Sequence, residues 1–112
     1  MPTRHTYLVL TNAITGTDEE FNRWYDEIHL GDVLQVPGIV AAQRFRAAGD
    51  AATETYRYCA LYEIESDDPA AVLAEIQRRA GSDSMQLSPT LSPDMLTCLY
   101  SPLASKRQSP IA

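Results

Sequence analysis

Apolar and polar residues alternate along the chain in blocks that are typical of strands and helices. Four blocks are rich in β-branched and aromatic residues, a composition that favours strands. They comprise residues 6–12, 39–47, 55–64 and 94–101. Two further blocks carry apolar residues three and four positions apart, the spacing of a helix that buries one side. The predicted order is therefore strand, helix, strand, strand, helix, strand.

The first predicted helix has signals at both ends. Thr17 is followed three residues later by Glu20, the spacing of a capping box, so we expect the helix to begin there. Gly31 is the expected C-terminal stop, and Pro37-Gly38 marks the turn before the next strand. Four apolar residues at helical spacing form its predicted buried side: Phe21, Trp24, Tyr25 and Ile28.

The second predicted helix begins at Asp67-Asp68-Pro69, with Pro69 near the first helical position, and ends near Gly81. The βαββαβ order predicts an α+β domain of the ferredoxin-like fold, a four-stranded antiparallel sheet with both helices on one face and strand order 4-1-3-2. We expect residues 1–103 to form this domain and residues 104–112 to be a flexible tail. Cys59 and Cys98 would then lie two strand spacings apart, too far for a disulfide.

The third predicted strand suggests that the chain pairs with a second copy. Its alternation places Tyr56, Tyr58, Ala60 and Tyr62 on one face of the sheet. We expect this to be the face without helices, and such an apolar and aromatic surface marks an interface or a ligand groove. Packing two such sheets face to face would bury both surfaces. We therefore expect a homodimer.

Charge and composition limit the classes of partner and compartment. The chain has 15 acidic and 9 basic residues and a formal net charge of -6, which argues against nucleic acid and anionic membranes as partners. No apolar run approaches the ~18 residues that a membrane span requires. We expect no signal peptide. The two cysteines lack the spacing of a zinc site and favour free thiols in the cytoplasm.

Residues 21–38 carry the most specific motif of the chain. The aromatic pair and acid Trp24-Tyr25-Asp26 are followed three residues later by His29, and Pro37-Gly38 precedes the second strand. This pattern resembles the EthD-like family of the dimeric α+β barrel superfamily. The resemblance implies a homodimer whose sheets form a barrel, with a ligand cavity between the sheet and the helices of each subunit. It also implies a small apolar or aromatic substrate.

His29 is the expected catalytic residue. It lies at the edge of the apolar stripe of the helix, and imidazole is the side chain best suited to move protons near neutral pH. Asp26 and Asp32, three residues to either side, are near enough in a helix to orient a ring nitrogen. Two alternatives remain: a histidine that only ends the helix favourably, or a metal site formed by two of these three residues with a further donor. We expect no metal.

Five residues are expected to contact the substrate: Tyr25, Tyr58, Tyr62, Asn12 and Trp24. A tyrosine hydroxyl can donate to a developing oxyanion, and an amide at the end of the first strand can face a ligand. Each also has a structural explanation, namely packing on the sheet, anchoring of the core or a turn. Arg44 and Arg46 alternate along the second strand, and we expect them to protect a sheet edge.

The leading hypothesis is a cofactor-independent lyase, isomerase or cyclase that acts on an aromatic or polyketide-like compound, with His29 as acid and base. The second predicted helix offers no convincing axial histidine for heme, so no cofactor is expected. One alternative is a non-catalytic protein that holds a hydrophobic ligand or assists another enzyme. A second alternative is a cofactor-free monooxygenase, since superfamily members include such enzymes.

Overall fold

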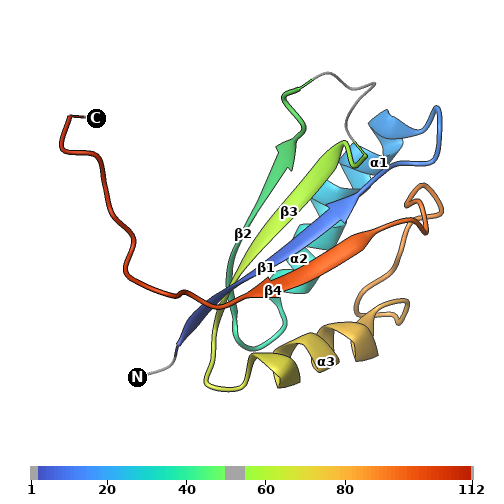
Figure 1. The fold of residues 1–112 in the computed structure, drawn as a ribbon. Coiled ribbons are helices and arrows are strands. Elements are labelled where there is room, and N and C mark those ends of the chain that lie inside the picture. Colours follow the sequence, from blue (N-terminus) through green and yellow to red (C-terminus); the bar gives the residue numbers. More distant parts are fainter. Residues whose placement is uncertain (1–2, 50–54, 112) are drawn as a thin grey trace.

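The computed structural model describes residues 3–49 and 55–111; residues 1–2, 50–54 and 112, which include part of the connection between the second and third strands, lie outside the described residues. Strands and helices follow one another in the predicted order (Figure 1). The strands are β1 (Arg4–Thr11), β2 (Ile39–Arg46), β3 (Tyr58–Glu65) and β4 (Leu96–Tyr100). The helical elements are α1 (Asp18–Trp24), η1 (Tyr25–His29), α2 (Leu30–Leu34) and α3 (Pro69–Arg79).

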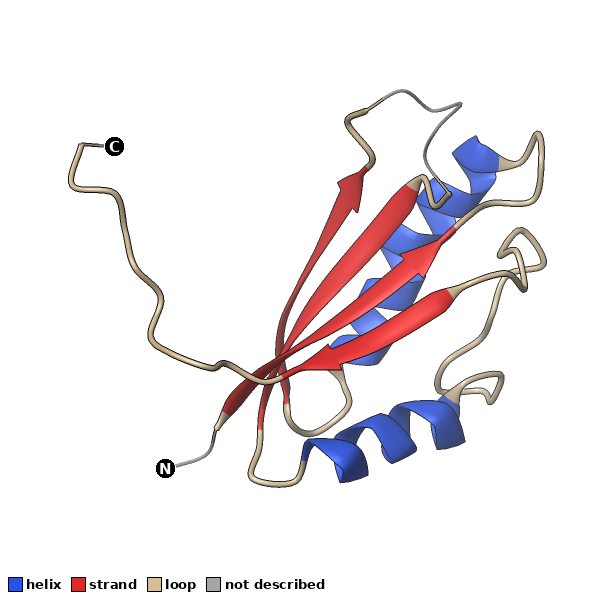
Figure 2. Ribbon diagram, in the orientation of Figure 1, coloured by secondary structure: helices blue, strands red, loops and turns tan. Residues whose placement is uncertain are grey.

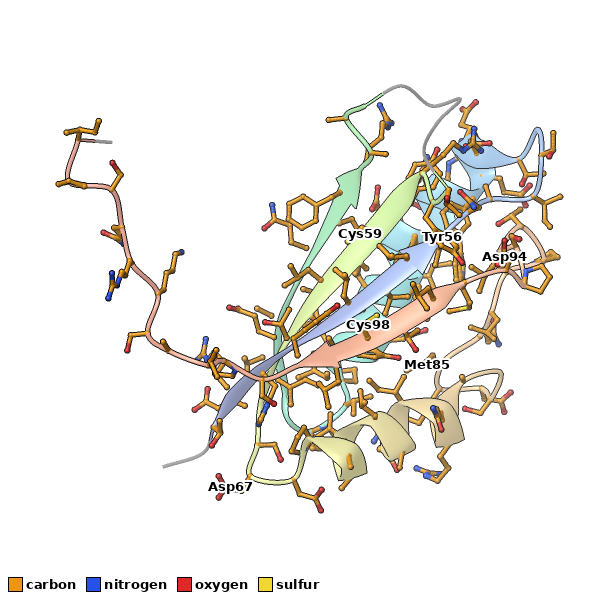
Figure 3. The ribbon with its side chains drawn as sticks, viewed as in Figure 1. Tyr56, Cys59, Asp67, Met85, Asp94 and Cys98 are labelled. Atoms are coloured by element: carbon orange, nitrogen blue, oxygen red, sulfur yellow. The ribbon has the colours of Figure 1, made fainter. Side chains whose placement is uncertain are left out.

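The strands form one antiparallel sheet in the order β2-β3-β1-β4, and the helices lie on one side of it (Figure 2). This is the predicted 4-1-3-2 order of an α+β ferredoxin-like domain. The central strands β1 and β3 pair along their whole length, from Arg4 opposite Glu65 to Thr11 opposite Tyr58. Cys59 and Cys98 are free thiols on β3 and β4, with β1 between them (Figure 3).

The aromatic face of β3 lies on the other side of the sheet from the one we expected. Tyr58, Ala60 and Tyr62 share a face as predicted, but they are buried on the side that the helices cover. Alternation along a strand shows which residues share a face, and it does not show which face the helices will cover. Tyr56 precedes β3, and its hydroxyl donates to Oδ1 of Asp94 at 3.3 Å (Figure 3).

The opposite side of the sheet, called here the open face, is still largely apolar. The strand register places eight apolar or weakly polar side chains there: Leu8, Leu10, Phe45, Cys59, Leu61, Leu96, Cys98 and Tyr100. In the described part of the chain, no helix lies over this face (Figure 1). An uncovered apolar sheet face therefore exists as predicted, although other residues make it.

The first helical region runs from Asp18 to Leu34 and passes through Gly31, where a stop was predicted. Its middle element η1 is a π-helix, in which the amide of Leu30 donates to the carbonyl of Tyr25 five residues earlier. The wider turn shifts the buried side by one position along the sequence. Ile28, predicted to be buried, is therefore 49% exposed, whereas Val33 is 2% exposed.

The two helical regions begin in different ways. The predicted capping box at Thr17 is wrong, because the Thr17 hydroxyl donates back to the carbonyl of Ile14 at 2.6 Å and caps no helical amide. In α3, the Asp68 carboxylate accepts the amide of Ala71 at 3.2 Å, and Pro69 stands in the first turn as predicted. The hydroxyl of Thr17 thus tightens the preceding turn, which the sequence pattern did not distinguish from a cap.

The turn at Gly38 connects the first helical region to the sheet and contacts α3. Gly38 has a φ of +99°, a conformation that favours glycine. A Cβ at this position would lie 2.8 Å from Cγ2 of Val72, which is itself buried. The predicted Pro37-Gly38 turn is thus required both by backbone conformation and by packing.

After β4 the chain leaves the domain and runs away from the sheet (Figure 1). Residues 101–111 contain no helix or strand, and Leu103 and Ile111 are fully exposed. The flexibility of residues 104–112 stays a prediction, with residue 112 outside the described residues. Within the described residues, no helix has both the length and the apolar character needed to cross a membrane.

Candidate functional site

A cavity of about 260 Å³ lies between the helix-covered side of the sheet and the helices. One group of lining residues is aromatic and comes from β1, η1 and β3: Tyr7, Tyr25, His29 and Tyr62. A second group comes from α3 and the segment that follows it: Ile76, Met85, Leu87, Leu91 and Met95. Met85 lies on the helix-covered side of the sheet, beyond β4 in the view of Figure 3. The cavity is thus mostly apolar, with few polar groups.

His29 is held in this cavity by two aromatic rings. Its imidazole stacks on the indole of Trp24 with 4.7 Å between centroids and 23° between planes. Tyr25 contacts it edge-on, at 4.9 Å and 89°. Nδ1 of His29 is buried and has no hydrogen-bond partner among the described residues. The side chain is therefore fixed in position while one ring nitrogen stays unpaired.

This environment keeps His29 neutral at neutral pH. Burial in apolar surroundings lowers its pKa from 6.5 to about 4, because the imidazolium loses its hydration there. The nearby charge of Asp32 acts in the opposite direction and raises this pKa, and the charge of Arg44 lowers it further. At neutral pH, His29 is accordingly a proton acceptor and not a proton donor.

The two aspartates predicted to orient His29 do not bond to it. Asp26 is exposed, and its Oδ1 accepts from Nη1 of Arg44 at 2.9 Å. Asp32 makes no hydrogen bond to His29 within the described residues and acts on it only through its charge. The expected hydrogen-bonded arrangement is wrong because η1 places Asp26 outward and Nδ1 of His29 inward, against the core.

The hydroxyls of Tyr25 and Tyr62 meet in the cavity at 3.1 Å. Both side chains are buried, and burial raises the pKa of each hydroxyl above its ordinary value of 10. Two hydroxyls carry two protons, and their mutual hydrogen bond uses one of them. Neither hydroxyl has another partner among the described residues, so the pair retains one O–H that can be donated to a ligand.

The remaining predicted site residues lie outside the cavity lining. Trp24 stacks behind His29, and its Nε1 donates to the carbonyl of Gln86. The Tyr58 hydroxyl donates to Asp18 at 2.6 Å. Asn12 holds the chain before β3, donating to the carbonyl of Thr55 and accepting the amide of Arg57. The structure therefore brings together His29, Tyr25 and Tyr62, with Trp24 as their support.

Arg44, expected from the strand pattern to protect a sheet edge, lies instead beside Tyr25. Its side chain is only 11% exposed, and its guanidinium lies 4.3 Å from the centroid of the Tyr25 ring. The residue opposite it in the sheet is Ala60, whose small side chain leaves room for the guanidinium under the helix. A small residue opposite an arginine on the neighbouring strand is the sequence feature that could have indicated the burial of this arginine. Protection of a sheet edge is thus the wrong explanation for Arg44.

Among the described residues, the second histidine and the side chains that could bind a metal lie outside this cavity or do not form a site. His5 is buried at the start of β1, and its Nδ1 lies 2.8 Å from the hydroxyl of Ser101. Across residues 3–49 and 55–111, no group of three His, Cys, Asp or Glu side chains is placed to hold a metal ion. The cavity around His29 is therefore the candidate site.

Neither a protein-family model nor a curated protein matches this sequence. Solved structures do match its fold. A dimeric ferredoxin-like protein from Thermobifida fusca superposes with a TM-score of 0.63 at 13% identity, over 90% of this chain and 92% of that one. The fold is ferredoxin-like. The cofactor-independent oxygenase SnoaB from Streptomyces nogalater gives 0.62 at 15% identity, over 95% and 99% of the two chains.

A third similar structure is the heme-degrader MhuD from Mycobacterium tuberculosis with two hemes in its active site, at a TM-score of 0.63 and 16% identity over 92% and 99% of the chains. The lining residues of this cavity do not fit a heme. α3 contributes Ile76 and Gln77 and no histidine. The imidazole of His29 is packed against Trp24 and Tyr25 with Nδ1 buried. The likeness to MhuD is therefore one of fold.

Proposed function

We propose that this protein is a small-molecule enzyme in which His29 removes a proton from a mostly apolar substrate bearing an enolisable carbonyl or an acidic hydroxyl. The observation that supports this most strongly is a neutral, firmly packed imidazole that lines the same apolar cavity as a tyrosine pair with a spare O–H. Base and oxyanion donor are the two groups that enolisation requires.

The low pKa of His29 determines the order of events. At neutral pH the resting imidazole holds no extra proton, so the residue must first act as a base. It takes a proton from the carbon next to the carbonyl, and the electron pair of that C–H bond moves to form the enolate. The imidazolium and enolate attract each other strongly at low dielectric, which offsets the desolvation of each. Return of the proton to another atom gives an isomer and restores neutral His29.

The size of the cavity limits the substrate. A dry apolar cavity of about 150 Å³ accepts benzene, so the space of about 260 Å³ here suits a molecule of roughly two fused rings. The few polar groups in the lining, chiefly His29 and the Tyr25–Tyr62 pair, favour a compound with one oxygen-bearing end. An aromatic bicyclic ketone or naphthol meets both conditions.

Deuterium exchange tests the proton-transfer step directly. We expect the protein to accelerate the exchange of deuterium from heavy water into the carbon positions next to the carbonyl of β-tetralone. Mass spectrometry measures the rate of this exchange. A His29→Ala variant should lose ~10² to 10⁴-fold of this rate, the usual contribution of a general base. His5→Ala removes the other imidazole of the chain, outside the cavity, and should exchange like the wild type. Equal rates in wild type and His29→Ala would contradict the role of His29.

A second candidate is cofactor-independent oxygenation, favoured by the fold similarity to SnoaB. In this reaction the deprotonated substrate gives one electron to molecular oxygen, and the resulting radical and superoxide combine to a peroxide. Oxygen uptake in the presence of dihydroxynaphthalene, measured with an oxygen electrode, distinguishes the two candidate reactions. Oxygen uptake that depends on His29 supports oxygenation, whereas exchange without uptake supports isomerisation. Tight binding with neither activity would support the non-catalytic ligand-binding alternative.

We further propose a homodimer formed through the open face, because eight apolar or weakly polar side chains there lack a cover in the described chain. Burial of such a face is the main driving force for association. The similarity to a dimeric ferredoxin-like protein and the EthD-like motif of residues 21–38 support this proposal.

We also propose that the protein is cytoplasmic, and the free thiols Cys59 and Cys98 support this location.

A further inference from the structure

Arg44 places a largely buried positive charge against Tyr25, which lines the cavity, and near two aromatic rings beside it. Its guanidinium lies 4.3 Å from the centroid of the Tyr25 ring, 5.5 Å from that of Tyr58 and 5.6 Å from that of Phe21. An arginine over an aromatic ring is attracted to the electrons of the ring face. Tyr25 is the ring it approaches most closely, and the Tyr25 hydroxyl belongs to the tyrosine pair of the cavity.

The charge of Arg44 is only partly cancelled by its ion pair. Nη1 donates to Asp26 at 2.9 Å and Nη2 donates to Asn22 at 2.8 Å. The Asp26 side chain is 59% exposed, so water screens its charge, whereas the Arg44 side chain is 11% exposed. Nε of Arg44 is buried without a partner among the described residues. A buried donor left unpaired costs stability.

We propose that Arg44 is a positioning residue that makes the Tyr25–Tyr62 pair a stabiliser of negative charge, so that the cavity prefers ligands whose oxygen is anionic. This inference rests on the proposed function of the same cavity. The guanidinium draws electron density from the Tyr25 ring and strengthens its hydroxyl as a donor. The pair then presents its one spare O–H to the ligand oxygen. Arg44 acts through Tyr25 and does not line the cavity itself.

The charges of Asp32 and Arg44 act differently on His29 and on the tyrosine pair. At His29, the charge of Asp32 raises the pKa by more than the charge of Arg44 lowers it. At Tyr25 and Tyr62, the charge of Arg44 lowers the pKa and opposes the effect of burial. Asp32 therefore favours a proton on the imidazole, and Arg44 favours an anion at the tyrosine pair. This is the distribution of charge that enolate formation requires.

Nitrophenol is a suitable probe because its absorbance shows whether it is ionised when bound. Its bound pKa should rise by about one to two pH units in an Arg44→Met variant, the size of one screened charge at close range. Arg44→Lys keeps the charge and should restore most of the wild-type value. Arg46→Met removes a neighbouring exposed arginine of β2 and should leave it unchanged.

The outcomes separate this inference from the proposed function. If nitrophenol binds and its pKa is the same in Arg44→Met, the role of Arg44 is wrong while the cavity remains a ligand site. If nitrophenol does not bind to the wild type, the proposed ligand class is wrong. Arg44 is then tested in the free protein by an NMR titration of His29, whose pKa should rise from about 4 in Arg44→Met. An unchanged pKa of His29 would overturn the inference.

Discussion

The imidazole of His29 stacks on the indole of Trp24, which lies five positions earlier in the sequence. In an α-helix, residues five apart point in clearly different directions, because successive side chains turn by about 100°. The π-helical element η1 closes its hydrogen bonds over five residues, so that the two rings come into register. Single π-turns of this kind are frequent at functional sites. The stack therefore depends on a local departure from regular helix.

The Trp24–His29 stack should be visible in fluorescence. Trp24 is the single tryptophan of the chain. An imidazolium next to an excited indole accepts an electron from it and quenches its emission, whereas neutral imidazole does so weakly. We expect the emission to fall as the pH is lowered, with a midpoint at the His29 pKa of about 4. A His29→Gln variant should lack this transition; a midpoint near 6.5 in the wild type would show that His29 is hydrated.

His29 should also make stability depend on pH. Its folded pKa of about 4 lies below the unfolded value of 6.5, so the unfolded chain binds more protons between these values. The free energy of unfolding is therefore full above the unfolded pKa and falls as the pH decreases towards 4. Between about pH 8 and about pH 5 the loss should be about 2 kcal/mol.

Urea unfolding at these two pH values measures this effect. His29→Gln should unfold with a free energy that changes much less over the same interval, since glutamine does not titrate. The carboxyl groups of Asp18 and Glu75, whose pKa values are lowered by hydrogen bonds and by arginine charges, contribute at lower pH. An equal loss in wild type and His29→Gln would assign the effect to another group.

Two glycines should respond in opposite ways to alanine. Gly38→Ala forces a side chain into a φ of +99° and places its Cβ 2.8 Å from buried Val72, so we expect a loss of at least about 2 kcal/mol. Gly31 is helical, with nothing within 4 Å of an added Cβ. Gly31→Ala should gain about 0.5–1 kcal/mol. Thermal unfolding compares the two; a destabilised Gly31→Ala would mean that the helix ends there after all.

The open face should be the dimer interface. Leu61 lies on the central strand β3 and points to this face. Leu61→Glu would place a charge in the middle of the proposed interface and should give monomers at micromolar concentration in sedimentation velocity. Leu34→Glu, the same substitution at an exposed helical position, should remain dimeric. A wild-type protein that already sediments as a monomer would refute the proposed homodimer.

The hydrophobic pattern was sufficient for the architecture. Strand and helix order follows from periodicity, and the antiparallel sheet with its 4-1-3-2 arrangement follows from the βαββαβ order. Local rules sufficed for the start of α3 and for the Gly38 turn. The elements and turns depend on interactions between residues near in sequence, which a pattern can represent. The order of those elements then predicts the long-range pairing of β1 with β3 and β4. His29, Tyr25 and Tyr62 were likewise singled out by residue type and position.

What the pattern could not decide was set by tertiary packing. The π-turn moves Ile28 outward and stacks His29 on Trp24, and a regular helical wheel does not contain that shift. The covered face of β3 and the burial of Arg44 beside Tyr25 depend on which side of the sheet the helices occupy. Alternation is the same for both sides of a strand, so only contacts between distant elements determine which side chains meet in the cavity.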